Sequence, residues 1–186
     1  SIVVANMSCN SSRTTGARPE ILDNLLRQNP DLLFFAGDQT YRHTEHTAGW
    51  IEFGLQFRDV MKDRPTICIP DDHDVGHPNL WGEGGEGQKT TQEAGGYEMP
   101  AAWVNVVHRT QTSHHPDPYD PAPSKRGTIN YYGPMTYGKV SFAILADRQW
   151  KSGPDRVQTG GPRRDHVVDP NFDCTKLDVP GLVLLG

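Results

Sequence analysis

Four side chains of types that bind metal ions stand in short polar segments of this chain: Cys9, Asp38, Tyr41 and Asp72. The carboxylates of Asp38, Asp72 and Asp74 would repel one another at low dielectric constant unless a cation neutralises them or some take up protons. A thiolate and a phenolate would suit a highly charged ion such as ferric iron, and remaining carboxylate oxygens would suit a harder ion such as calcium. These residue types therefore predict a metal centre.

The tetrad at residues 71–74 places three carboxylates and His73 in one turn. An aspartate after a strand is also a common N-cap of the next helix, and this alternative stays open for Asp38. The tetrad exceeds what a cap requires, which favours a functional role over a solvated turn. His73 could protonate a leaving group, bind a metal or lie at the surface.

These residues need elements that bring them together. Apolar runs at residues 2–5, 32–36 and 66–69 predict strands, and apolar side chains at helical spacing predict helices over 19–28 and 50–61. This alternation predicts an α/β fold with a parallel sheet. Each polar segment follows the carboxyl end of a strand, where open α/β sheets bind ligands. We therefore expect the three segments to converge on one edge of the sheet.

The rest of the chain divides at about residue 130. Residues 76–130 are rich in Gly, Pro and His, which predicts a loop-rich insert with a short helix at 101–108. Its stretch at 114–118 fits a substrate entrance or an ordinary solvated loop. Residues 131–186 predict paired strands at 131–135 and 139–145, then an irregular tail and an apolar run at 179–185. Arg148 could bind a phosphate or pair with Asp147.

Composition narrows the class of protein. The 186 residues carry a formal net charge of −5 and no basic block, so a nucleic acid partner is not expected. No apolar run reaches the roughly 18 residues of a membrane span. The three cysteines are an odd number at wide spacing, which argues against a disulfide framework, and Cys68 is expected to be buried.

Four motifs together resemble the alkaline phosphatase D-like branch of the calcineurin-like metallophosphatase superfamily. They are Ser-Cys-Asn at 8–10, Ala-Gly-Asp-Gln-Thr-Tyr at 36–41, Pro-Asp-Asp-His-Asp at 70–74 and Ala-Asp-Arg-Gln at 146–149. In that superfamily a Gly-Asp pair supplies a carboxylate that bridges two metals. An Asn-His pair supplies a ligand and a catalytic histidine, and Asp72-His73 stands in its place here. The wider superfamily begins with Asp-x-His, and the cysteine motif at 8–10 is the departure that selects this branch.

The resemblance implies roles for the candidate residues. Cys9 and Tyr41 would bind Fe³⁺, Asp38 would bridge it to Ca²⁺, and Asp72 would bind Ca²⁺, although other divalent metals stay open. His73 would assist the leaving oxygen. The implied fold is a layered αββα sandwich, of which residues 1–186 would be the N-terminal portion. Further metal ligands would come from a later segment or a second chain.

The activity implied by this resemblance is hydrolysis of a small phosphate ester by a metal-bound hydroxide, with Arg148 as a second catalytic residue. Both monoesters and diesters are candidate substrates, and a secreted or periplasmic location is expected. Two alternatives stay open. One is hydrolysis of sulfate or other esters on the same scaffold, and the other is a metal-binding fragment without catalytic activity.

Overall fold

The computed structural model describes residues 1–11, 18–76, 97–124, 126–146 and 182–185. The chain forms two compact units, Ser1–Gly76 and His77–Gly186. Each unit is built around its own sheet of three strands, and each is described separately.

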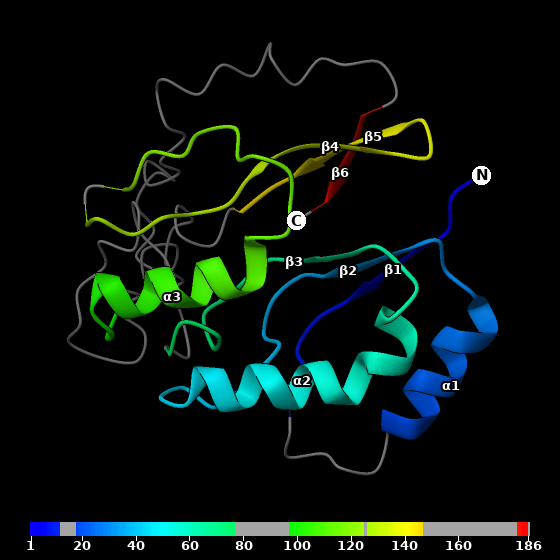
Figure 1. Ribbon diagram of the computed structural model, residues 1–186, viewed down its shortest axis with the longest axis horizontal. Coiled ribbons are helices and arrows are strands. Elements are labelled where there is room, and N and C mark those ends of the chain that lie inside the picture. The colour runs from blue at the N-terminus through cyan, green and yellow to red at the C-terminus, as the bar shows by residue number, and fades with distance from the viewer. Residues whose placement is uncertain (12–17, 77–96, 125, 147–181, 186) are drawn as a thin grey trace, which may run out of the picture. The chain divides into compact units, whose positions relative to one another are not determined.

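The first unit alternates strands and helices. Its elements are β1 (Val4–Met7), α1 (Arg18–Gln28), β2 (Leu32–Phe35), α2 (His46–Met61) and β3 (Thr66–Cys68). The strands lie in the order β1-β2-β3, and both pairs are parallel (Figure 1). The predicted α/β class with a parallel sheet is therefore confirmed.

Two elements of this unit differ from the prediction by more than one residue. The first strand spans Val4–Met7 rather than 2–5, because Asn6 and Met7 pair with Phe34 and Phe35 of β2. The helix α2 begins at His46 rather than at residue 50. Its first turn carries no apolar stripe that the sequence could reveal, and its buried residues there are His46 and Gly49.

The core of the first unit lies between the sheet and its two helices, which are on the same side of the sheet in Figure 1. The ring of Phe35 meets Phe53 and Phe57 of α2 edge-on, at centroid distances of 4.8 and 5.1 Å. Leu32 and Phe34, which alternate with Leu33 and Phe35 along β2, are also fully buried. Burial on both faces is typical of a central strand in a parallel sheet.

The second unit contains α3 (Ala101–Thr112), β4 (Gly133–Tyr137), β5 (Val140–Ile144) and β6 (Leu182–Leu185). β4 and β5 are antiparallel, and β6 is parallel to β5. Gly138 and Lys139, at the turn of this hairpin, have φ angles of 56° and 68°, as a type I′ turn requires. The helix is longer than the predicted 101–108, because the buried polar residues Gln111 and Thr112 continue its inner face.

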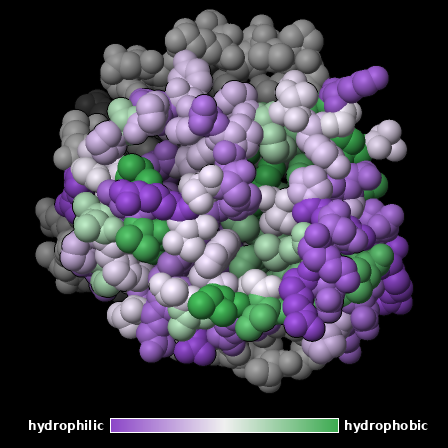
Figure 2. All heavy atoms as spheres, viewed as in Figure 1, coloured by the Kyte–Doolittle hydropathy of each residue, from purple (hydrophilic) through white to green (hydrophobic). Residues whose placement is uncertain are grey.

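Apolar side chains also reach the surface, including Ile51 and Leu55 on α2. Figure 2 shows hydrophobic residues interspersed with hydrophilic ones among the coloured atoms of the visible face. Among the described residues, no helix is both long enough and apolar enough to cross a membrane.

Candidate metal centre

The three polar segments of the first unit meet beyond the carboxyl ends of their strands. The Cys9 amide donates to the Gly37 carbonyl at 3.2 Å, and the Asn10 amide donates to the Asp38 carbonyl at 2.8 Å. The side chain of Asn10 also donates to Gln56 of α2 at 3.0 Å. These bonds hold the segment after β1 against the segment after β2.

Asp38 is the residue on which the candidate ligands converge. Its Oδ2 lies 3.0 Å from the Tyr41 hydroxyl and 3.7 Å from the Cys9 sulfur. Its Oδ1 accepts a hydrogen bond of 3.3 Å from the His73 amide. The side chain therefore faces all three loops. The N-cap alternative for Asp38 is wrong, because α2 begins only at His46 and Glu45 occupies its N-cap position.

The backbone is strained where these ligands stand. Cys9 and Asp38 have φ angles of 58° and 57°, a left-handed conformation that residues other than glycine seldom adopt. Strain of this kind costs on the order of 1–3 kcal/mol per residue and concentrates at functional sites. The fold retains it at two of the four candidate metal ligands.

Gly37 permits the close approach of the second and third segments. Its φ angle is +102°, and a Cβ atom added there would clash with the Cβ of Asp71 and lie 2.9 Å from the Asp71 amide nitrogen. No residue other than glycine fits this position without moving the turn that carries Asp72.

Asp72 and His73 complete the cluster. Asp38, Asp72 and His73 each offer one ligand atom, and these atoms lie within 4.8 Å of one another. Asp38 is 6% exposed and Asp72 is 3% exposed. The third segment is therefore not a solvated turn. Two buried carboxylates in one cluster fit a cation, because a cation would offset their mutual repulsion.

Asp74 has a different role from its neighbours. Its Oδ2 accepts from the backbone amides of Asp38 at 2.6 Å and Asp71 at 3.0 Å, and its Oδ1 accepts from the amide of Thr40 at 3.1 Å. The sequence had grouped Asp74 with the carboxylates that compete for a cation. In the fold, its carboxylate accepts from backbone N–H groups of two loops and is not part of the candidate ligand group, so its role is to fix the loops.

Tyr41 is held in its neutral form within this group. Burial, followed by the negative charge of Asp38, raises the pKa of the Tyr41 phenol well above its usual value. The neutral hydroxyl donates to Asp38 Oδ2. A highly charged cation could displace this proton, and the phenolate would then be a ligand beside the Asp38 carboxylate.

Sequence reasoning missed His43. Its Nε2 lies 2.6 Å from Nδ1 of His73, which brings the loop after β2 into contact with the turn after β3. The one signal in the sequence was its place two residues after Tyr41 in the same polar segment.

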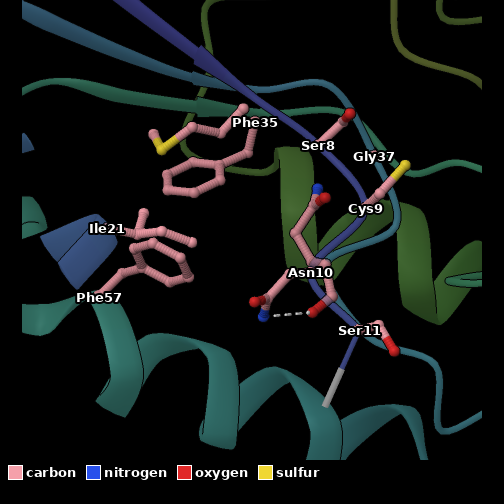
Figure 3. Close-up of a pocket in the computed structure, with 10 residues that line it drawn as sticks. Ser8, Cys9, Asn10, Ser11, Ile21, Phe35, Gly37 and Phe57 are labelled. Atoms are coloured by element: carbon pink, nitrogen blue, oxygen red, sulfur yellow. Dashed lines mark hydrogen bonds between the residues drawn. The ribbon is translucent and has the colours of Figure 1, made fainter. Parts of the chain in front are cut away.

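A cleft of about 190 Å³ adjoins the cluster. Ile21, Phe35 and Phe57 lie on one side of it, and the segment that contains Cys9 and Asn10 lies on the other (Figure 3). In this view the Cys9 sulfur points away from the apolar side chains, toward the outside of the cleft.

Three other predictions concern residues outside the cluster. Arg148 lies outside the described residues, so its proposed contact with a phosphate stays a prediction. His115, in the second unit, packs against His114 and Tyr131 at centroid distances of 4.4 and 4.6 Å. Cys68 is buried as expected, and burial raises the pKa of its thiol.

The chain matches no known protein-family model, no curated protein sequence and no solved structure in the comparisons made with it.

Proposed function

We propose that this protein is a metal-dependent phosphoric ester hydrolase of the alkaline phosphatase D-like kind. The observation that carries the proposal is the position of Asp38, whose two carboxylate oxygens face different partners. Oδ2 lies beside the Cys9 sulfur and the Tyr41 hydroxyl, and a ligand atom of Asp38 lies within 4.8 Å of those of Asp72 and His73. A carboxylate in this position suits a bridge between two cations.

The ligand atoms of these side chains suit two different ions. Cys9, Tyr41 and Asp38 would hold Fe³⁺, because a thiolate, a phenolate and a carboxylate together supply three negative charges. Asp72 would hold Ca²⁺ together with the shared Asp38, because calcium prefers carboxylate oxygens. The αββα sandwich belongs to the same proposal. A secreted or periplasmic location belongs to it as well.

Bound cations would supply the chemistry that these side chains lack, since they lower the pKa of water and offset charge on phosphoryl oxygens. His73 would donate a proton to the leaving oxygen of the ester. Arg148 would bind phosphoryl oxygens through its planar guanidinium group. Asp74 and Gly37 would keep the loops at the spacing that the metal ligands need.

Metal binding is tested by loading the chain with Fe³⁺ and Ca²⁺ and measuring metal content and visible absorption. We expect a visible band, because ferric iron bound to a phenolate or thiolate absorbs visible light. The band should weaken in both Cys9→Ser and Tyr41→Phe, because each substitution removes one of the two absorbing ligands. Asp38→Asn should lose bound metal, whereas Asp59→Asn, at an exposed carboxylate of α2, should not. An unchanged band in both Cys9→Ser and Tyr41→Phe would exclude these iron ligands.

Activity is tested with p-nitrophenyl esters of phosphate and sulfate and with the bis-p-nitrophenyl phosphate diester. We expect hydrolysis of a phosphate ester, and a loss of at least about a hundredfold in Asp72→Asn, which would lose a metal ligand. For methyl phosphate, whose leaving group needs a proton, His73→Gln should lose about a hundredfold as well, since acid catalysis contributes on this order. Preference for the sulfate ester would identify the alternative hydrolase. A chain that binds metal but hydrolyses none of these esters would be the metal-binding module without catalysis.

A further inference from the structure

His43 and His73 meet edge to edge. Nε2 of His43 lies 2.6 Å from Nδ1 of His73. The ring centroids are 4.9 Å apart, and the ring planes are inclined by 25°. Because the nitrogens are much closer together than the centroids, they lie between the two rings, which are nearly coplanar. This is the geometry of an N–H···N hydrogen bond, in which one ring donates and the other accepts.

Two further contacts restrict His73. The Tyr41 ring covers one face of its imidazole, with centroids 4.1 Å apart and planes inclined by 32°. The His73 amide donates to Asp38 Oδ1 at 3.3 Å. The ring is therefore held at one edge, over one face and through its backbone. With Nδ1 engaged by His43, Nε2 is the nitrogen of His73 that remains for a substrate.

We propose that His43 is a positioning residue whose Nε2 accepts a hydrogen bond from Nδ1–H of the protonated His73 ring. His73 is then oriented to donate its Nε2 proton to the leaving oxygen, and the neutral Nδ1–H tautomer that remains is held by His43. This inference rests on the proposed hydrolase function. Proton donation matters most for esters with poor leaving groups such as alkoxides, and least for p-nitrophenolate, which leaves without protonation. Substitution of His43 should therefore slow the hydrolysis of alkyl phosphate esters more than that of p-nitrophenyl phosphate.

The test compares His43→Leu, which removes the ring nitrogen, with His43→Gln, whose side-chain amide can reach the position of Nε2. His43 is half-buried and lies in the loop between β2 and α2, so neither change removes a core side chain. His114→Leu, at an exposed histidine of the second unit, is the matched control. The turnover of methyl phosphate and p-nitrophenyl phosphate is measured for each, together with the ¹⁵N spectrum of the His73 ring.

In His43→Leu we expect kcat for methyl phosphate to fall about tenfold or more, with KM unchanged and less than about a twofold change for p-nitrophenyl phosphate. The ¹⁵N signals of His73 should change from a single tautomer to an exchange average. His43→Gln should restore most of both properties, and His114→Leu should resemble the parent. Equal losses for both esters, or a turnover unchanged in His43→Leu, would overturn the proposal.

The ¹⁵N spectrum of His73 distinguishes failure of the positioning role of His43 from failure of the proposed hydrolase function. If the parent chain hydrolyses neither ester, the hydrolase function fails. The ¹⁵N spectrum then decides whether His43 positions His73, because it does not depend on turnover. A His73 spectrum that is identical in the parent and in His43→Leu would overturn the positioning role in either case.

Discussion

The carboxylate of Asp74 accepts a hydrogen bond of 2.6 Å from the backbone amide of Asp38. The same carboxylate accepts from the amides of Asp71 and Thr40, so one buried side chain joins the loops after β2 and β3. Asp38 adopts its left-handed conformation within this network. The geometry of the candidate metal centre therefore depends on a residue that is not one of its candidate ligands.

Asp74→Asn should therefore weaken both folding and metal binding. An amide NH₂ group cannot accept from the backbone amides, so at least one buried N–H group loses its partner. We expect the free energy of unfolding to fall by about 2 kcal/mol, measured by urea denaturation. Metal affinity should fall as well. Asp59→Asn is the control, because the ion pairs of Asp59 are exposed. An equal loss of stability in Asp74→Asn and Asp59→Asn would contradict this role for Asp74.

Gly37→Ala and Gly54→Ala should have opposite effects on stability. A Cβ atom at Gly37 would collide with Asp71, and the φ angle of +102° is itself unfavourable for alanine. At Gly54 in α2, an added Cβ would meet nothing within 4 Å among the described residues apart from the backbone of its own helix, so alanine should stabilise the helix by roughly 0.5–1 kcal/mol. Thermal unfolding of both variants measures the difference. A Gly37→Ala variant that is as stable as the parent and binds metal equally well would refute the close approach.

The buried His46 should make stability depend on pH. Burial lowers the pKa of His46 from 6.5 to about 4, so the unfolded chain binds a proton that the folded chain excludes. Stability from this group is complete above the unfolded pKa of 6.5 and is lost as pH falls toward 4, by about 3 kcal/mol in total. Urea denaturation of the metal-free chain at several pH values should show this loss. His46→Phe should have a flatter profile, and parallel profiles would contradict the prediction.

Binding of ferric iron should release a proton from Tyr41. The pKa of this phenol is raised by burial and by Asp38, so the hydroxyl is protonated at neutral pH and must lose its proton to bind a metal. Affinity should therefore increase with pH. Calorimetric titration with ferric nitrilotriacetate, in two buffers of different ionisation enthalpy, counts the protons released. We expect Tyr41→Phe to release about one proton fewer than the parent, and equal release would show that Tyr41 is not a ligand.

The alternation of strands and helices in the first unit could be predicted from the chain alone. Uninterrupted apolar runs such as Leu32–Phe35 indicate strands buried on both faces, and a parallel sheet then places the ends of its strands on a common edge. The sequence pattern was sufficient here, because the order of apolar and polar residues along the chain determines which side chains of a strand or helix are buried. It failed at the start of α2, where a buried histidine and glycine replace the apolar stripe.

The tertiary structure decided the role of each polar residue. Asp72 and Asp74 are two positions apart and look equivalent in the chain. Asp72 lies in the candidate ligand cluster, whereas Asp74 accepts hydrogen bonds from three backbone amides. His43 gained its contact with His73 from a segment 30 residues away. Residue type and spacing reveal which groups can do chemistry. Their partners depend on loop conformations and close approaches between segments, and these form only when the packed sheet brings the loops together.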